Sequence, residues 1–146
     1  MKIYISYFAQ VRNFPSNMIG FSTAKFEPKW LQKGQSQNGI YWMGIPPLKP
    51  GKECDGLCNG KCIDKHPKSC AFLKTYRAQL DRLNFNEIIE KMKAIALKIQ
   101  KSEGFQSVDL ALLVYETPQN KCSERIVLQQ WFKDNGMELE EWKKTK

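Results

Sequence analysis

The sequence lacks any apolar run close to the roughly 20 residues that a membrane-spanning helix needs. Its first residues, 1–7, also lack the long apolar stretch and small-residue cleavage site of a secretory signal, and are typical of a first β-strand instead. We therefore expect a cytoplasmic protein with no membrane segment. Because thiols stay reduced in that compartment, clustered cysteines there favour a metal site over disulfides.

Internal repeats and low-complexity segments are also absent, and no run of basic residues interleaved with aromatic residues predicts a dedicated DNA-binding motif. The 146 residues are 42% hydrophobic, which predicts one domain, residues 1–146, with a substantial core. The formal charge of +8 is uneven, with +5 in residues 1–50 and −1 in residues 105–146. This excess predicts an anionic partner, such as a nucleotide or nucleic acid, although solvated lysine-rich faces would produce the same charge.

Hydrophobic periodicity predicts alternating strands and helices. Residues 2–8 and the nearly continuous apolar run 108–115 are typical of buried strands, and the second fits the centre of a parallel sheet. Residues 70–83 and 87–103 have apolar positions at helical spacing, and the second helix would end at Gly104. The remaining expected elements are short strands at 19–23 and 40–43, a helix at about 122–135 and a last strand within 137–142. This order predicts a three-layer, Rossmann-like α/β domain with a mostly parallel sheet.

Four cysteines lie within seventeen residues, in a loop rich in Gly, Asn, Asp and Pro. Such a loop has little core of its own, and four thiolates would complete the tetrahedral shell of a metal. The spacing Cys-x3-Cys-x3-Cys-x7-Cys differs from the paired knuckles of zinc fingers, so an iron–sulfur cluster is the alternative to zinc. His66 could replace one thiolate, and free thiols or disulfides are the remaining interpretations. We expect residues 51–70 to form a closed, structural zinc-binding insertion, with the ligands Cys54, Cys58, Cys62 and Cys70.

A second constellation follows the expected central strand. Cys122 and Arg125 lie where the next helix would begin, at the carboxyl end of the sheet, where open α/β sheets bind ligands. A helix N-terminus favours anions and lowers the pKa of a thiol, so Cys122 is a candidate nucleophile. Arg125 could bind the same anion, and Glu116 is the nearest candidate general base. In the structural alternative, Cys122 fills a small buried space and Arg125 is a surface cation.

Three short motifs resemble a known family. Residues 112–116, Leu-Leu-Val-Tyr-Glu, followed by Cys122 and Arg125, resemble the signature strand and the cysteine–histidine–arginine turn of the domain of unknown function 488 family. Two further motifs resemble the family and occur in the same order as they do there. Residues 11–15 resemble the turn after the family's first strand. Tyr76, Gln79 and Leu80 resemble its tyrosine–glutamine–leucine helix. The resemblance implies an α/β fold with its site in the crevice. The cysteine loop would then be an elaboration of the kind expected in phage and bacterial relatives.

The chain departs from these family motifs at two positions. No histidine separates Cys122 from Arg125, and Gln10 stands where the family has an aspartate before its valine–arginine pair. If the family's polar residues are catalytic, two candidate proton carriers are missing. The family itself has no established reaction, so the resemblance implies a fold and a candidate site only.

These observations predict two functions, and a host- or defence-interaction protein of phage origin is a third possibility that the sequence does not test. In the first, Arg12 and Arg125 converge on a phosphate or carboxylate, and the domain acts on a nucleotide or nucleic-acid-like substrate. A base or ring could stack there on Tyr7, Tyr115 or Trp42. In the second, the domain is a non-enzymatic module whose metal loop and basic first half contact nucleic acid or another protein. The missing histidine and aspartate favour the second function.

Overall fold

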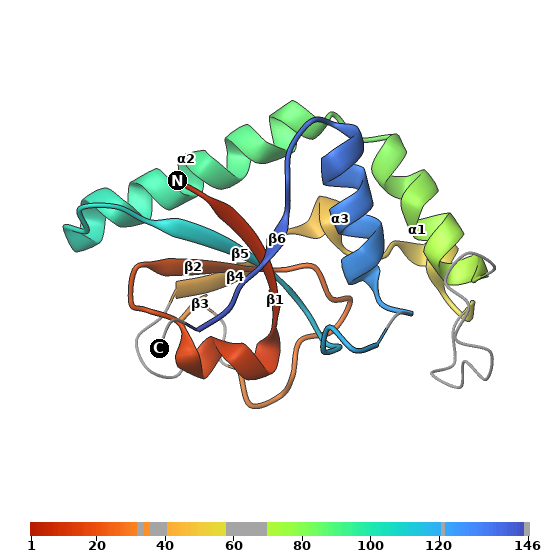
Figure 1. The fold of residues 1–146 in the computed structure, drawn as a ribbon, viewed down its shortest axis with the longest axis horizontal. Coiled ribbons are helices and arrows are strands. Elements are labelled where there is room, and N and C mark those ends of the chain that lie inside the picture. Colours follow the sequence, from red (N-terminus) through yellow and green to blue (C-terminus); the bar gives the residue numbers. More distant parts are fainter. Residues whose placement is uncertain (32–33, 36–40, 58–69, 121, 145–146) are drawn as a thin grey trace.

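The computed structural model describes residues 1–31, 34–35, 41–57, 70–120 and 122–144. Within these residues, five parallel strands form a sheet in the order β4-β2-β5-β1-β6, and a short antiparallel strand, β3, extends the β4 edge (Figure 1). The strands are β1 (Ile3–Tyr7), β2 (Met18–Ser22), β3 (Gly34–Gln35), β4 (Tyr41–Gly44), β5 (Asp109–Val114) and β6 (Glu140–Glu141). This arrangement confirms the prediction of a Rossmann-like α/β domain with a mostly parallel sheet.

In the part of the chain that the structure describes, three α-helices and three 3-10 helices connect these strands. The expected helix at 87–103 begins two residues earlier, because the Asn84 side chain accepts a hydrogen bond from the Glu87 N–H and caps the helix. Gly104 ends it in the left-handed conformation, with φ of 72°. None of the described helices is long and apolar enough to cross a membrane. The helices are η1 (Phe8–Asn13), η3 (Pro46–Leu48), η4 (Lys52–Cys54), α1 (Ala71–Asp81), α2 (Phe85–Glu103) and α3 (Glu124–Asp134).

The direction of each crossover decides which face of the sheet it covers. From β1 to β2 and then to β4, the chain moves toward one edge, and η1 and residues 23–31 pack on one face. The chain then returns to β5 and continues to β6, and α2 and α3 pack on the opposite face (Figure 1). Right-handed crossovers require this change of face when the direction reverses. The neighbouring strands β1 and β5 therefore have connections that leave on opposite faces, which is where open α/β sheets bind ligands.

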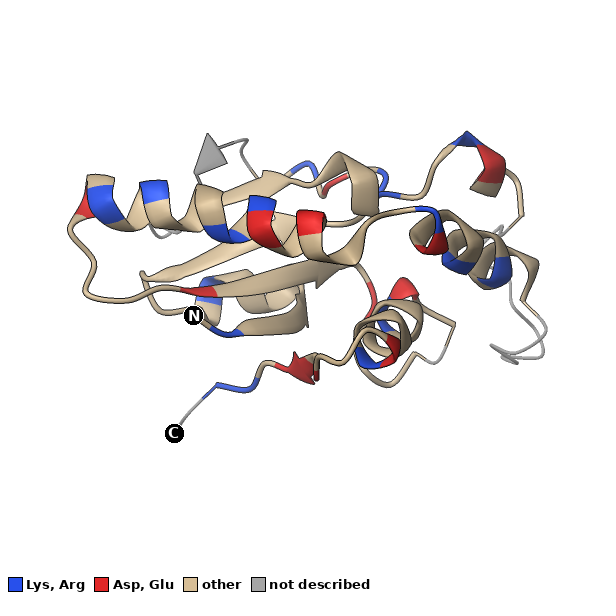
Figure 2. Ribbon diagram, turned by 90° about the horizontal axis from the view of Figure 1, so that it is seen from above, with Lys and Arg blue, Asp and Glu red and all other residues tan. Residues whose placement is uncertain are grey.

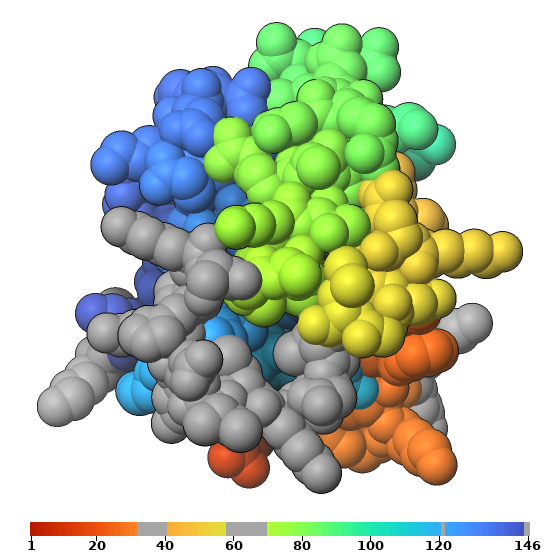
Figure 3. Space-filling view, turned by 90° about the vertical axis from the view of Figure 1, so that its right-hand side faces the viewer, coloured from red at the N-terminus to blue at the C-terminus, as the bar shows by residue number. Residues whose placement is uncertain are grey.

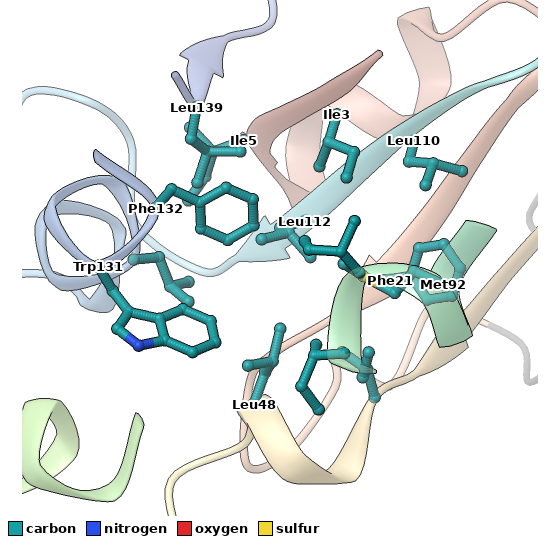
Figure 4. Packing of buried hydrophobic residues seen from close by; sticks show 14 of the residues in the cluster. Ile3, Ile5, Phe21, Leu48, Met92, Leu110, Leu112, Trp131, Phe132 and Leu139 are labelled. Atoms are coloured by element: carbon teal, nitrogen blue, oxygen red, sulfur yellow. The ribbon is translucent and has the colours of Figure 1, made fainter. Parts of the chain in front are cut away.

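Alternating side chains of β5 divide the core into two clusters. Leu110 and Leu112 face the α-helices, where they pack with residues of β1, β2, α2 and α3 (Figure 4). Ala111 and Leu113 face the other side. Among the described residues, that second face is covered by η1, the loop after β2 and the C-terminal segment. The largest side chains in its cluster are Phe8, Phe14, Trp42 and Trp142.

Candidate functional site

Four connections meet at the edge of the sheet where β1, β2, β4 and β5 end. We call this surface the carboxyl edge; it consists of η1, residues 23–31, residues 45–57 and the described residues 115–120 and 122–123. Specific contacts join neighbouring connections. The rings of Phe8 and Tyr115 meet edge to face, with centres 5.1 Å apart. Ion pairs join Lys25 to Asp55 and Lys49 to Glu27. Figure 3 views this part of the molecule, with the loop after β2 in orange and residues after β4 in yellow.

Arg125 lies inside the protein, in the first turn of α3, with 4% of its side chain exposed. Its Nε donates a hydrogen bond to Glu141 Oε1, and its Nη1 donates to the backbone oxygen of Glu116, each at 2.7 Å. The guanidinium also lies 5.6 Å from the centre of the Tyr7 ring. Arg125 is therefore not a surface cation. It joins α3, β6 and the chain leaving β5.

One nitrogen of Arg125, Nη2, is buried and has no hydrogen-bond partner among the described residues. The same is true of the second carboxylate oxygen of Glu141, Oε2. Because Nε–H and one Nη2–H point to the same side of a planar guanidinium, Nη2 faces the carboxylate that Nε already binds. The charge of Arg125 is thus directed mainly at Glu141.

Ser123, rather than Cys122, caps α3. The Ser123 hydroxyl accepts a hydrogen bond from the Arg125 N–H at 3.1 Å and donates one to Glu116 Oε2 at 3.3 Å. Cys122 precedes the cap, is half-buried, and donates its N–H to the Asn120 side chain at 2.9 Å. The expected helix start at about residue 122 therefore lies two residues too early. Cys122 adjoins the first turn without belonging to it.

Glu124 is the titratable group at this site that the sequence analysis missed. Burial raises the pKa of its carboxyl from 4.5 to about 7, and the negative charge of Glu116 adds to this effect. The Glu124 charge in turn contributes, after burial, to the raised pKa of Tyr76 and of Cys54. For Cys54, the charge of the neighbouring Glu53 contributes more than that of Glu124. An acidic residue in a first helical turn is usually a solvated dipole partner, so the sequence carried no signal for its burial.

Two of the four predicted metal ligands, Cys58 and Cys62, and the alternative ligand His66 lie outside the described residues. Cys54 is buried, and its sulfur lies 3.9 Å from the Gln79 Oε1 of α1. Cys70 occupies the N-cap position of α1 and packs against the main core. Within the described part of the chain, no three candidate ligands gather into a metal site. Zinc binding stays a prediction.

The other predicted site residues have different environments. Arg12 is exposed in the last turn of η1, whereas the side chain of Arg125 is buried, so the two arginines have different environments. Trp42 is 2% exposed and belongs to the core, which removes it as a stacking surface. Tyr7 is half-buried beneath Arg125. Tyr115, in contrast, is 49% exposed.

Two further exposed rings lie in the loop after β2. Phe26 is 71% exposed and Trp30 is 48% exposed, although the same loop buries Ala24, Pro28 and Leu31. The Thr23 hydroxyl and N–H both donate hydrogen bonds to the Leu113 backbone oxygen, so this loop starts beside the end of β5. The negative charge of Glu27 contributes, after burial, to the raised pKa of Tyr115. The sequence did contain a signal, since two lysine–aromatic pairs flank Glu27-Pro28.

Comparisons with protein-family models, with curated proteins and with solved structures gave no match. The resemblance to the domain of unknown function 488 family therefore rests on the three motifs alone.

Proposed function

We propose that the carboxyl edge binds single-stranded nucleic acid by stacking bases on exposed aromatic rings. The supporting observation is the exposure of Phe26, Trp30 and Tyr115 on the connections that follow β2 and β5, two strands that pair with each other. Large rings are ordinarily buried, because each contributes much apolar area to a core. Aromatic side chains that remain exposed beside cations are typical of single-strand binding surfaces, where stacking is worth about 1–3 kcal/mol per base.

The loop that carries two of these rings is held at both ends. Ala24 and Leu31 are buried in the smaller core cluster, and Pro28 is buried between them. Phe26 and Trp30 therefore project from an anchored backbone. A fixed platform loses less conformational entropy on binding than a mobile loop does.

Cations accompany the rings. The Lys25 ammonium lies 5.7 Å from the centre of the Phe26 ring and also pairs with Asp55. Lys29 and Lys52 are exposed, and within the described part of the chain neither has an acidic partner within ion-pair distance. Phosphates would approach these two side chains, and the formal charge of +8 adds long-range attraction. The expected affinity falls as salt rises.

Tryptophan fluorescence tests this proposal. Trp42, Trp131 and Trp142 are 2%, 2% and 9% exposed, whereas Trp30 is 48% exposed, so quenching by a stacked base reports mainly on Trp30. Titration with a single-stranded thymidine oligonucleotide should quench the emission, and added salt should reverse it. A duplex of equal length should quench less. Unchanged emission, together with an oligonucleotide that the protein does not retard in gel electrophoresis, would overturn the proposal. Quenching by a mononucleotide but not by the oligonucleotide would restrict the ligand to nucleotides.

Zinc binding by the cysteine loop is a second proposal. It is supported by the attachment of both described ends of the loop to α1, Cys54 through Gln79 and Cys70 through the helix N-cap. A metal would then organise the loop as a structural staple, since four protein ligands leave no open position. Elemental analysis of the purified protein would detect one zinc per chain, and a visible absorption band with iron would indicate an iron–sulfur cluster instead.

The catalytic roles of Cys122, Arg125, Arg12 and Glu116 stay predictions. The donors of Arg125 mostly bind protein groups, and Cys122 precedes the helix cap. These contacts favour a binding module over an enzyme. The segments whose sequence motifs resemble the domain of unknown function 488 family would then serve as a scaffold.

A further inference from the structure

A cleft lies between α2 and the segment that follows β4. Its volume is about 420 Å³, which is within the range of small-ligand sites. Its walls are almost entirely apolar. They include Ile45, Pro46 and Pro47 on one side and Ile88, Ala94 and Ile95 on the other.

Two lysines of α2, Lys91 and Lys98, also line this cleft. They are seven residues apart, so they lie on the same side of the helix, about 10 Å apart along its axis. Both are exposed, and in the described ranges neither has a carboxylate within ion-pair distance. Figure 2 shows the basic bands of α2 in the middle and C-terminal part of the helix. The cleft therefore combines an apolar floor with a cationic rim.

We propose that this cleft binds a small amphipathic anion, an aliphatic chain that ends in a carboxylate. The chain would lie against Ile88 and Ile95, and the carboxylate would pair with Lys91 or Lys98. Ile95 is 37% exposed, so a bound chain would remove apolar surface that now contacts water. Charge complementarity selects an anionic ligand over a neutral or cationic one. The size of the cleft selects a small molecule over a protein partner, whose interface would extend over several times this surface.

Calorimetric titration of the intact protein with dodecanoate, kept below its micelle concentration, tests this assignment. We expect one dodecanoate per chain. The neutral analogue dodecanol should bind about tenfold more weakly, because it cannot form the charge-assisted hydrogen bond. Absence of dodecanoate binding, or equal binding of dodecyltrimethylammonium, would overturn the proposal.

Substitutions on α2 locate the site. Ala94→Trp should abolish binding, because Ala94 is exposed and the new ring would occupy the cleft without entering the core. Leu97→Trp is the matched control, since Leu97 is 46% exposed and does not line the cleft. The double change Lys91→Gln and Lys98→Gln should weaken binding about tenfold, whereas Lys101→Gln should not. Equal loss of binding in Ala94→Trp and Leu97→Trp would contradict the site, and circular dichroism would confirm that both variants are folded.

Discussion

Arg125 donates a hydrogen bond of 2.7 Å to Glu141. The pair is largely buried, since 4% of the arginine side chain and 18% of the glutamate side chain are exposed. The pair joins the first turn of α3 to β6, which lies at one edge of the sheet. Through Nη1, the same guanidinium holds Glu116 at the end of β5. Arg125 thus positions the segment that follows β5, which is part of the carboxyl edge.

Replacement of Arg125 should cost much of the stability of the fold. Arg125→Met leaves the half-buried Glu141 carboxylate without its partner and removes a donor from the Glu116 carbonyl. Breaking a buried ion pair in this way typically costs about 3–5 kcal/mol in the free energy of unfolding. Urea unfolding followed by circular dichroism would measure this change.

Two other variants separate the ion pair from general effects of removing charge. Arg82→Met breaks an exposed pair with Glu53 and should cost less than about 1 kcal/mol. The double variant Arg125→Met with Glu141→Leu should be more stable than Arg125→Met alone, because no unpaired carboxylate remains. If Arg125→Met costs no more than Arg82→Met, the account of Arg125 as a structural link is wrong.

Glu124 should make stability fall as pH rises. Its pKa is about 7 in the folded protein and near 4.5 when unfolded, so between these values the folded state holds a proton that the unfolded state has lost. The contribution of Glu124 to the free energy of unfolding is therefore highest below pH 4.5. It falls between pH 4.5 and pH 7 and stays constant at higher pH. The full difference corresponds to about 3 kcal/mol.

The variant Glu124→Gln should remove this pH dependence. Its free energy of unfolding should exceed that of the original protein at pH 8, and the two should approach each other near pH 5. Glu90→Gln, at an exposed position of α2, is the control and should leave the pH profile unchanged. Parallel pH profiles for Glu124→Gln and the original protein would show that Glu124 is solvated.

The boundaries of the longer elements could be predicted because their patterns are local. Residues 87–103 have helical spacing and end at a glycine, and the expected strand at 108–115 is nearly continuous in apolar residues, so both were predicted to within two residues. The region 17–50 was harder, since its strands are short and several prolines interrupt it. The handedness of crossovers, not local pattern, decides where these strands lie.

The position of Glu116, Cys122 and Arg125 after β5 could be predicted from the sequence, but their contacts could not. The order of strand and helix correctly indicated the edge where β5 ends, because carboxyl ends of parallel strands meet there. The pairing of Arg125 with Glu141 depends on the register of β6 against β1, which no local motif specifies. The burial of Glu124 and the exposure of Phe26 likewise result from tertiary packing.

Gln79 should contribute to stability through the chain segment that precedes the cysteine loop. Its side chain accepts a hydrogen bond from the Gly51 N–H at 2.8 Å and donates to the Lys49 oxygen at 2.6 Å. Gln79→Leu leaves these half-buried backbone groups unpaired and should cost about 2–3 kcal/mol in urea unfolding. Gln130→Leu removes only an exposed bond to Asp134 and should change stability little. Equal effects would show that Gln79 does not hold this segment.

Fluorescence anisotropy of a labelled single-stranded thymidine oligonucleotide tests most directly whether the carboxyl edge binds nucleic acid. The double variant Phe26→Ala and Trp30→Ala removes two exposed rings, and Leu97→Ala removes an exposed side chain of α2 as the control. At fixed salt, the double variant should bind about 30-fold more weakly or worse, and the control should bind as the original protein does. An unchanged affinity of the double variant, or no binding by the original protein, would contradict the account.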